Sequence, residues 1–443
     1  MDGGGITDEE LAGFHRTVGR LRALPVDDPV RLRAEQVAAS FARDGRTRRR
    51  KARGAELSAA DAAVMAATAM GALDRREDAP LTSDGSAGVF GRPRACYVCK
   101  TPYRQVDSFY HRLCPDCALD NTARRTLGTD LSGRRALLTG GRVKIGFQLA
   151  LMMLRDGAEL LVTSRFPHDT VRRFRAEPGS ATWLDRLTVL AVDLRDPRQV
   201  LGLCEQLRQE GEPLDILVNN AAQTVRRPPE SYALLAAGER PGLPEGVRAA
   251  PGFTPMAALE GGPSALPVIL READEAGLLP DPSPDNSWSA RLGELDPAEV
   301  LETQLVNALA PALLCDRLLP LLLASPHPRR YVVNVTAVEG RFAVRNKTAG
   351  HPHTNMAKAA LNMLTRTSAA ELAEQGVHMC AVDTGWITDE NPAPKKERIA
   401  GAGFRTPLDI VDGAARVYDP IVRGEAGAPV SGVFLKDYRE AEW

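Results

Sequence analysis

Four cysteines form two pairs whose spacing suits a metal ion. Cys96 and Cys99 make the first CxxC pair, and Cys114 and Cys117 make the second after an interval of fourteen residues. Each pair can turn two thiolates toward one ion, and two such turns complete a tetrahedral site. We therefore predict a structural zinc ion with no open ligand position, and we expect His111 to be a neighbour of the ion rather than a ligand.

A glycine turn marks a second candidate site. Residues 134–146, RRALLTGGRVKIG, predict a buried strand, a sharp turn and the start of a helix. Glycine permits the sharp turn, and the amides at the start of the helix can face a pyrophosphate group. The cofactor-binding residues predicted in this segment are Thr139, Gly140, Arg142, Lys144, Ile145 and Gly146.

Three later strands are expected at 159–163, 187–192 and 214–218, with helices between them. This alternation predicts an α/β fold with a doubly wound, Rossmann-like parallel sheet that binds its ligand at the carboxyl ends of the strands. The candidate cofactor-binding residues at those ends are Ser164 and Arg165, then Asp193 and Leu194, then Asn220 and Ala221.

The order of these motifs resembles that of the short-chain dehydrogenase/reductase superfamily, in which TGxxxGxG, an adenine-side Asp and NNAG follow one another. The resemblance extends from about Asp130 to about Tyr438 and implies a nicotinamide dinucleotide cofactor. Arg165 stands where the family reads the adenosine ribose, and a basic residue there suits a 2′-phosphate. NADP(H) is therefore favoured over NAD(H), the alternative being that Arg165 is a solvated loop residue. The resemblance also implies that Asp193 contacts the adenine amino group.

One position of the glycine turn departs from the family pattern. Lys144 occupies the place of the middle glycine, which normally allows close approach of the pyrophosphate. A lysine fits there if its side chain points away, and together with Arg142 it would add positive charge near the phosphates.

The serine and tyrosine that reduce carbonyl groups in this family are absent. Ala337 stands at the second serine of the family's N-[IV]-S-S-x-x-G segment. Lys358 matches the lysine of YxxxK, but Thr354 stands where the tyrosine belongs. A threonine hydroxyl is too weak an acid to replace a tyrosine whose pKa is lowered by the lysine and the nicotinamide. Ordinary ketone reduction by the usual catalytic residues is therefore not supported.

Other residues of the predicted site are retained or stand nearby. Asn307 matches the family's helix asparagine, and Gly385 lies in a segment that resembles N-P-G-x-[IV]-x-T, which closes over the nicotinamide. Lys358 can bind both hydroxyls of the nicotinamide ribose without the tyrosine. His353 is a candidate acid/base, with Asn307 and Lys358 organising water; the alternative is that it lies on an exposed loop without a chemical role.

Three functions are compatible with this pattern. The first is an atypical NADP(H)-dependent oxidoreductase whose proton comes from a histidine or water. The second is a redox-inactive nucleotide-binding regulator or scaffold that uses the zinc module as an interaction surface. The third is a non-redox enzyme that reuses the cleft for a small or peptide-linked substrate.

The elements that position these residues divide the chain into three regions. We predict a helical N-terminal region at 1–90, a small zinc-binding module at 94–128 and a Rossmann-like domain at 130–443. An insertion at about 224–285 is expected to be a lid, a substrate wall or an oligomer contact, with surplus loop as the alternative; it includes a short helical piece near 267–277.

The N-terminal region is expected to hold separate helices, including one at 29–42 and one at 58–73. The basic run at 46–53 lies between them, and it predicts a solvated helix or linker rather than a nucleic-acid contact because it carries no aromatic residues. We expect that removing zinc unfolds residues 95–120 without touching the sheet directly.

Composition gives little reason to expect nucleic acid or membrane as a partner. The chain has 443 residues and a net charge of −1, and it has no apolar run of membrane-spanning length. We expect a soluble, cytoplasmic protein. The helices that carry Asn307 and Lys358 are the expected contact of a homodimer, and the N-terminal region is a candidate surface for another protein.

Overall fold

The computed structural model describes residues 5–72, 75, 80–81, 88–239, 242–256, 273–281, 283–344, 347–401 and 403–443. A nine-stranded sheet in the order β11-β10-β9-β8-β6-β3-β4-β5-β7 forms its body, and only β11 pairs antiparallel. The strands are β3 (Arg135–Leu138), β4 (Glu159–Ser164), β5 (Leu187–Ala191), β6 (Ile216–Asn219), β7 (Val247–Ala249), β8 (Arg330–Thr336), β9 (Val377–Asp383), β10 (Phe434–Lys436) and β11 (Arg439–Ala441).

Helices cover both faces of this sheet, as the doubly wound prediction requires. Successive side chains of β3 point to opposite faces, so Ala136 and Leu138 join one apolar core while Leu137 joins the other. The first core is covered by α4 (Lys144–Arg155), α5 (Pro167–Ala176) and α13 (Ile410–Glu425), and the second by α6 (Pro197–Glu210), α10 (Ala310–Ala324) and α11 (Pro352–Glu374).

The order of the strands reverses between β3 and β6. Connections from β3 run to β4 and β5 on one side, whereas β6 is followed by β8 and β9 on the other. Loops on the two sides diverge at such a point and leave a crevice at the carboxyl ends of the strands. The predicted cofactor site therefore has its expected place in the sheet.

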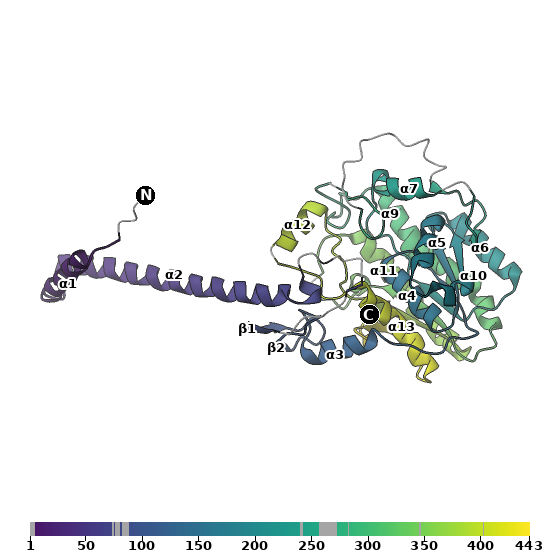
Figure 1. Ribbon diagram of the computed structural model, residues 1–443, viewed down its shortest axis with the longest axis horizontal. Coiled ribbons are helices and arrows are strands. Elements are labelled where there is room, and N and C mark those ends of the chain that lie inside the picture. The colour runs from purple at the N-terminus through teal and green to yellow at the C-terminus, as the bar shows by residue number, and fades with distance from the viewer. Residues whose placement is uncertain are drawn as a thin grey trace.

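The N-terminal helices form an arm that extends away from the body (Figure 1). The arm consists of α1 (Asp8–Arg22) and α2 (Pro29–Ala66), so the two helices expected at 29–42 and 58–73 are one. The basic run continues the helix because Arg and Lys are good helix formers and no proline interrupts it. It is the solvated helix that the sequence suggested.

The cysteine module packs against the body through a third apolar core. It contains an antiparallel hairpin, β1 (Val89–Ala95) with β2 (Pro102–Gln105), followed by α3 (Pro115–Arg124). Its buried side chains Phe90, Tyr110 and Leu113 share a cluster with Leu408 and Ile410 near the start of α13. The module is therefore continuous with the Rossmann-like domain in its packing.

The insertion contributes both a strand and cleft-lining residues. It forms η4 (Pro229–Tyr232), α7 (Ala233–Gly238) and the edge strand β7, and the helical piece expected near 267–277 lies mostly outside the described residues. Pairing of β7 with β5 fixes this segment to the sheet. The described part of the insertion is therefore attached to the sheet and lines the cavity, rather than being surplus loop.

One helical stretch of the described residues, Pro297–Ala324, is long and apolar enough to span a membrane. It comprises α9 (Pro297–Gln304), a π-helical turn (Leu305–Leu309) and α10. Leu314 and Leu318 of this stretch are buried in the second core, facing the sheet and α6. That packing identifies it as a core helix. The described part of the body also contains α12 (Ala393–Gly401).

Candidate active site

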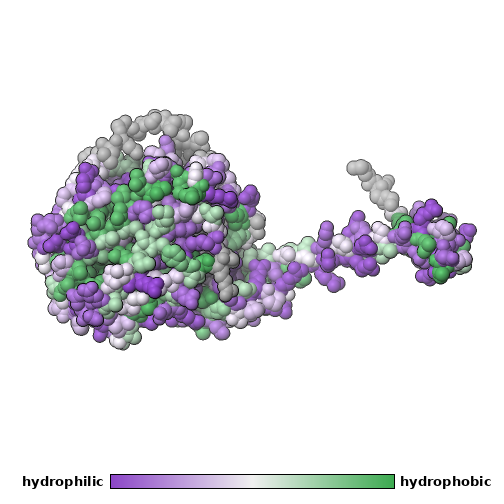
Figure 2. Space-filling model, turned by 180° about the vertical axis from the view of Figure 1, so that it is seen from behind, coloured by the Kyte–Doolittle hydropathy of each residue, from purple (hydrophilic) through white to green (hydrophobic). Residues whose placement is uncertain are grey.

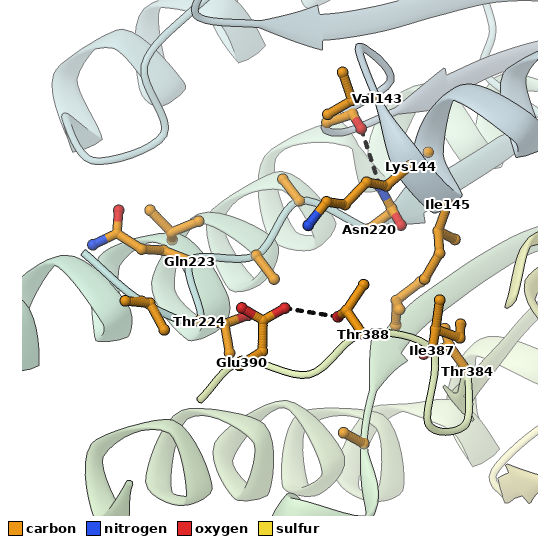
Figure 3. Close-up of a pocket in the computed structure, with 18 of the residues that line it drawn as sticks. Val143, Lys144, Ile145, Asn220, Gln223, Thr224, Thr384, Ile387, Thr388 and Glu390 are labelled. Carbon is orange, nitrogen blue, oxygen red and sulfur yellow. Dashed lines mark hydrogen bonds between the residues drawn. The ribbon is translucent and has the colours of Figure 1, made fainter. Parts of the chain in front are cut away.

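A cavity of about 820 Å³ lies at the carboxyl ends of the strands. It is lined by the glycine turn, the loops after β4, β5, β6, β8 and β9, and parts of the insertion. Figure 3 shows Val143, Lys144 and Ile145 on one side of it and the loop of Ile387, Thr388 and Glu390 on the other. The cavity is large enough to hold a dinucleotide cofactor or a comparable ligand.

The glycine turn leaves the N-terminus of α4 free for an anion. Val143 precedes α4 and caps it with no side-chain hydrogen bond, so the first amides face the cavity without a side-chain partner. A Cβ on Gly146 would lie 2.1 Å from the carbonyl oxygen of Gly140 and 2.6 Å from Nδ2 of Asn220. Only glycine fits this contact, which holds the helix start against the turn.

Lys144 has a backbone conformation that glycine adopts readily and lysine rarely does. Its φ is +54°, in the left-handed region. The side chain does not turn away from the site: it extends into the cavity between Gln223 and Glu390 (Figure 3). Burial would raise the pKa of Glu390, but Lys144 and other cations outweigh this effect and lower it, so a carboxylate faces the Lys144 ammonium. A pyrophosphate group that approaches the turn closely would therefore meet the charged side chain of Lys144 rather than the bare backbone of a glycine.

Arg142 is engaged elsewhere. Its Nη1 donates to the Asp169 carboxylate at 2.6 Å and to the carbonyl of Ala276 in the insertion at 2.8 Å. The guanidinium also lies 5.1 Å from the centre of the Phe166 ring. Arg142 thus ties the insertion to the glycine turn through Nη1, while the residue still lines the cavity.

Arg165 lies at the end of the cavity where the family binds adenosine. Its guanidinium lies 5.5 Å from the ring centre of Phe166 and 5.4 Å from that of Tyr232, and these rings stack on each other. No hydrogen bond or ion pair from Arg165 occurs within the described residues. Its neighbour Ser164 is buried and accepts from the Phe166 amide. Arg165 is therefore a positioned cation with unused donors.

Asp193 and Leu194 line the same end after β5. Burial would raise the pKa of Asp193, but Arg195 outweighs it: Nε and Nη2 of Arg195 donate to both carboxylate oxygens at 2.6–3.0 Å, and the pKa is lowered. The carboxylate faces the cavity in its charged form and can still accept from a base.

Asn220 and Asn307 hold the walls of the crevice. Asn220 donates to the carbonyls of Thr139 and Gly140, which joins β6 to the glycine turn, and Ala221 donates to the Thr139 hydroxyl. Asn307, in the π-helical turn, accepts from the Gln223 amide and donates to the Gln223 carbonyl. Asn307 therefore positions the loop after β6, and both of its polar groups are occupied.

Lys358 and Thr354 form the other end of the cavity together with Ala337 and Glu339. The Lys358 side chain is buried, and its Nζ donates to the carbonyl of Val335 at 2.9 Å. Burial lowers the pKa of Lys358 to about 8, against the opposing effect of Glu339. The Thr354 hydroxyl is also buried and has no hydrogen-bond partner among the described residues. An orphaned hydroxyl beside a buried ammonium fits a polar ligand.

His353 is not among the residues that line the cavity. Its side chain is fully buried in α11, and burial lowers its pKa, so the neutral ring faces the protein interior. His351 stacks on Trp288 with ring centres 3.9 Å apart, and its Nδ1 donates to the Trp288 carbonyl at 2.9 Å. The structure does not bring His353 to the reacting end, because the first turn of α11 points it inward.

The segment after β9 borders the cavity through Gly385, whose φ is +83°. Asp383 precedes it and pairs with Lys436 of β10 at 3.0 Å.

The cavity lining also includes two residues of the cysteine module that were not predicted, Tyr97 and Lys100. The signal that could have found them is their place in the sequence, because Tyr97 lies between two predicted metal ligands and Lys100 directly follows the second.

The four predicted metal ligands converge. The sulfur atoms of Cys96, Cys99, Cys114 and Cys117 all lie within 4.8 Å of one another, and those of Cys99 and Cys114 are 3.6 Å apart. Sulfurs at about 2.3 Å from a tetrahedral zinc would be roughly 3.8 Å apart, so the donor set fits that ion. His111 does not belong to this cluster.

Comparison with known proteins gives matches over the body of the chain. The sequence model of a family described as short chain dehydrogenase matches residues 134–235, and one described as Enoyl-(Acyl carrier protein) reductase matches residues 282–403. An uncharacterized protein of Acanthamoeba polyphaga mimivirus is 31% identical over 350 residues, which cover 74% of this chain and 71% of that protein.

Two further matches cover less of this chain or have lower sequence identity. The C-signal protein of Myxococcus xanthus is 32% identical over 146 residues, covering 33% of this chain and 80% of that protein. A short-chain dehydrogenase of Burkholderia cenocepacia, solved in complex with NADP, is 22% identical with a TM-score of 0.47, covering 69% of this chain and 97% of that one.

Proposed function

The chain belongs to the short-chain dehydrogenase/reductase superfamily, and on this premise we propose that it is an atypical NADP(H)-dependent oxidoreductase that does not use a tyrosine as its proton donor. One observation carries the proposal: Arg165 and Lys358 line the same cavity, on either side of the free amides at the start of α4. A 2′-phosphate, a pyrophosphate and a nicotinamide ribose each have a matching group there.

The residues of the cavity suggest how the reaction would be organised. The nicotinamide, when bound, supplies or accepts a hydride. Lys358 would exchange its bond to the Val335 carbonyl for the ribose hydroxyls, and the Thr354 hydroxyl would hold water or the substrate oxygen. Because Thr354 is too weak an acid to deliver a proton by itself, we assign proton delivery to water held in this end of the cavity.

A redox-inactive role is the second candidate. It is favoured by the replacement of both catalytic groups, because Ala337 and Thr354 line the cavity where the family places its serine and tyrosine. A chain of this kind would bind the nucleotide and use its module or arm to contact a partner. The third candidate, a non-redox enzyme in the same cleft, has no observation that favours it over these two.

We further propose that the cysteine cluster binds a structural zinc ion, since four thiolates leave no position for a substrate. Reduced thiols suit the cytoplasm, where we place the protein.

We propose that the protein assembles as a homodimer. Hydrophobic residues gather on the face of the body that Figure 2 shows, and exposed large side chains of the Asn307 and Lys358 helices are Leu301, Leu309, Met356 and Met363.

Replacement of Arg165 by Ala tests the cofactor. We expect the Kd for NADPH to rise about 10- to 100-fold, since a charge-assisted contact to phosphate contributes about 1.5–3 kcal/mol, while the weaker affinity for NADH stays unchanged. Calorimetric titration of the zinc-replete protein measures both. Arg172→Ala is the control, because Arg172 lies on α5 outside the cavity lining. Equal affinity of the wild-type chain for NADPH and NADH, or binding of neither, would contradict the proposal.

Native mass spectrometry of the full chain tests the metal and the assembly together. We expect a particle of two chains that carries one zinc ion for each chain. A metal-free particle would refute the zinc site, and a single chain at micromolar concentration would refute the dimer.

A further inference from the structure

The metal-binding loop reaches the cavity through one side chain. Tyr97 lies between the ligands Cys96 and Cys99, yet it is also part of the cavity lining. Its hydroxyl oxygen accepts a hydrogen bond from the amide of Trp386 at 3.0 Å. A Cβ on Gly385 would stand 3.5 Å from the same oxygen, so the tyrosine rests directly against the backbone of the loop after β9.

The same loop is anchored on its other side by the core of the module. Ile387 is 4% exposed and shares the apolar cluster of Phe90, Tyr110 and Leu113. Its carbonyl accepts from the Thr406 hydroxyl at 2.8 Å. Residues 383–388 therefore pack between the sheet and the cysteine module, and their position depends on both.

The geometry points to Tyr97 as a positioning residue through which the metal site sets the affinity of the cavity for the nicotinamide half of the cofactor. This inference rests on the proposed function, because the nicotinamide end is identified by the resemblance of residues 383–388 to the family's closing segment. Only two residues separate Cys96 from Cys99, so both ends of the short segment that carries Tyr97 are fixed when the two thiolates bind one ion. An ion bound to both thiolates fixes the loop and thereby the Tyr97 hydroxyl.

The contact between Tyr97 and the loop after β9 changes the expected effect of removing the metal. If the module were independent, loss of zinc would unfold residues 95–120 and leave the cavity as it is. Because Tyr97 and Ile387 connect the module to the closing segment, loss of zinc is expected to loosen that segment as well.

The Tyr97→Phe variant isolates the contact, because it removes only the hydroxyl that accepts from Trp386. We expect its Kd for NADPH to rise about five- to tenfold, the effect of one lost hydrogen bond. The Kd for adenosine 2′,5′-bisphosphate, which lacks the nicotinamide half, should not change. A general structural defect would instead weaken the binding of both ligands alike. An equal loss of affinity for the two ligands, or no loss of affinity for NADPH, would overturn the inference.

Tyr103→Phe is the matched control within the same module. The Tyr103 hydroxyl donates to the His111 carbonyl at 2.7 Å and faces the module's own core, away from the cleft. Its removal should leave the affinities for NADPH and adenosine 2′,5′-bisphosphate unchanged, with zinc content equal in all three proteins. A loss of NADPH affinity in this variant equal to that of Tyr97→Phe would also overturn the inference.

Removing zinc from the full chain with a chelator is the second test of the inference. The metal-free protein should bind NADPH at least about tenfold more weakly, and added zinc should restore the affinity. Unchanged affinity without metal would overturn the coupling. Failure of the zinc-replete wild-type chain to bind NADPH would instead refute the proposed function, and with it this inference; binding that is insensitive to Tyr97→Phe would refute the inference alone.

Discussion

Replacement of Arg125 by Met is expected to lower the free energy of unfolding by about 3–5 kcal/mol, because it leaves buried carboxylates without their cation. Nη1 and Nη2 of Arg125, from the end of α3, donate to the two oxygens of Asp409 at 2.6 and 2.9 Å. Nη1 also lies 3.2 Å from the carboxylate of Asp412. Both aspartates are fully buried, and burial together with Asp409 raises the pKa of Asp412.

Urea unfolding monitored by circular dichroism measures this loss. Arg198→Met is the control, since Arg198 makes an exposed ion pair with Asp196 and should change stability by less than about 0.5 kcal/mol. The double variant Arg125→Met/Asp409→Asn should recover part of the loss, because it removes one of the stranded charges. A single variant as stable as the wild-type chain would mean that the two aspartates do not depend on Arg125.

The contact between the cysteine module and α13 illustrates which part of the fold could be predicted from the sequence and which could not. The sheet follows from local patterns: apolar runs, the glycine turn and the helices between strands each indicate their own structure. The docking of the module does not, because Arg125 and Asp409 are 284 residues apart, and the place of Asp409 at the start of α13 indicates a helix cap rather than an ion pair. An arginine at the end of a helix is ordinarily read as a solvated residue.

The candidate site shows the same division. Residues that follow the strands, such as Arg165 and Asp193, line the cavity because parallel strands end at one edge. The direction of a side chain depends on partners that are distant in sequence, so Arg142 turns to Asp169 and His353 turns into the core. Sequence spacing could place these residues near the cavity but could not say which way they point.

Lys358→Met is expected to weaken NADPH binding about 10- to 100-fold while raising the stability of the unliganded protein. The loss of affinity follows from removing a charged donor for the ribose hydroxyls, worth about 1.5–3 kcal/mol. The gain in stability follows because, among the described residues, the buried ammonium is offered only the Val335 carbonyl and the nearby charge of Glu339. A methionine has a similar shape and carries no desolvation cost.

The pH dependence of that gain has a definite sign. Burial lowers the pKa of Lys358 to about 8 in the folded chain, from the ordinary value of 10.5. Between these values the unfolded chain binds more protons than the folded chain, so this group makes wild-type stability rise with pH. Lys358→Met should therefore be more stable than the wild-type chain below pH 8, by up to on the order of 3 kcal/mol, and the difference should shrink toward pH 10.5.

Opposite effects on affinity and stability would identify Lys358 as a residue that serves the ligand at the expense of the fold. Lys395→Met makes the same chemical change on the exposed surface of α12, and it should alter neither quantity. Calorimetric titration with NADPH and urea unfolding between pH 7 and 10 provide the two measurements. A variant that is less stable than the wild-type chain and binds NADPH equally well would show that the lysine supports the fold, and the nicotinamide ribose would then have to bind elsewhere in the cavity.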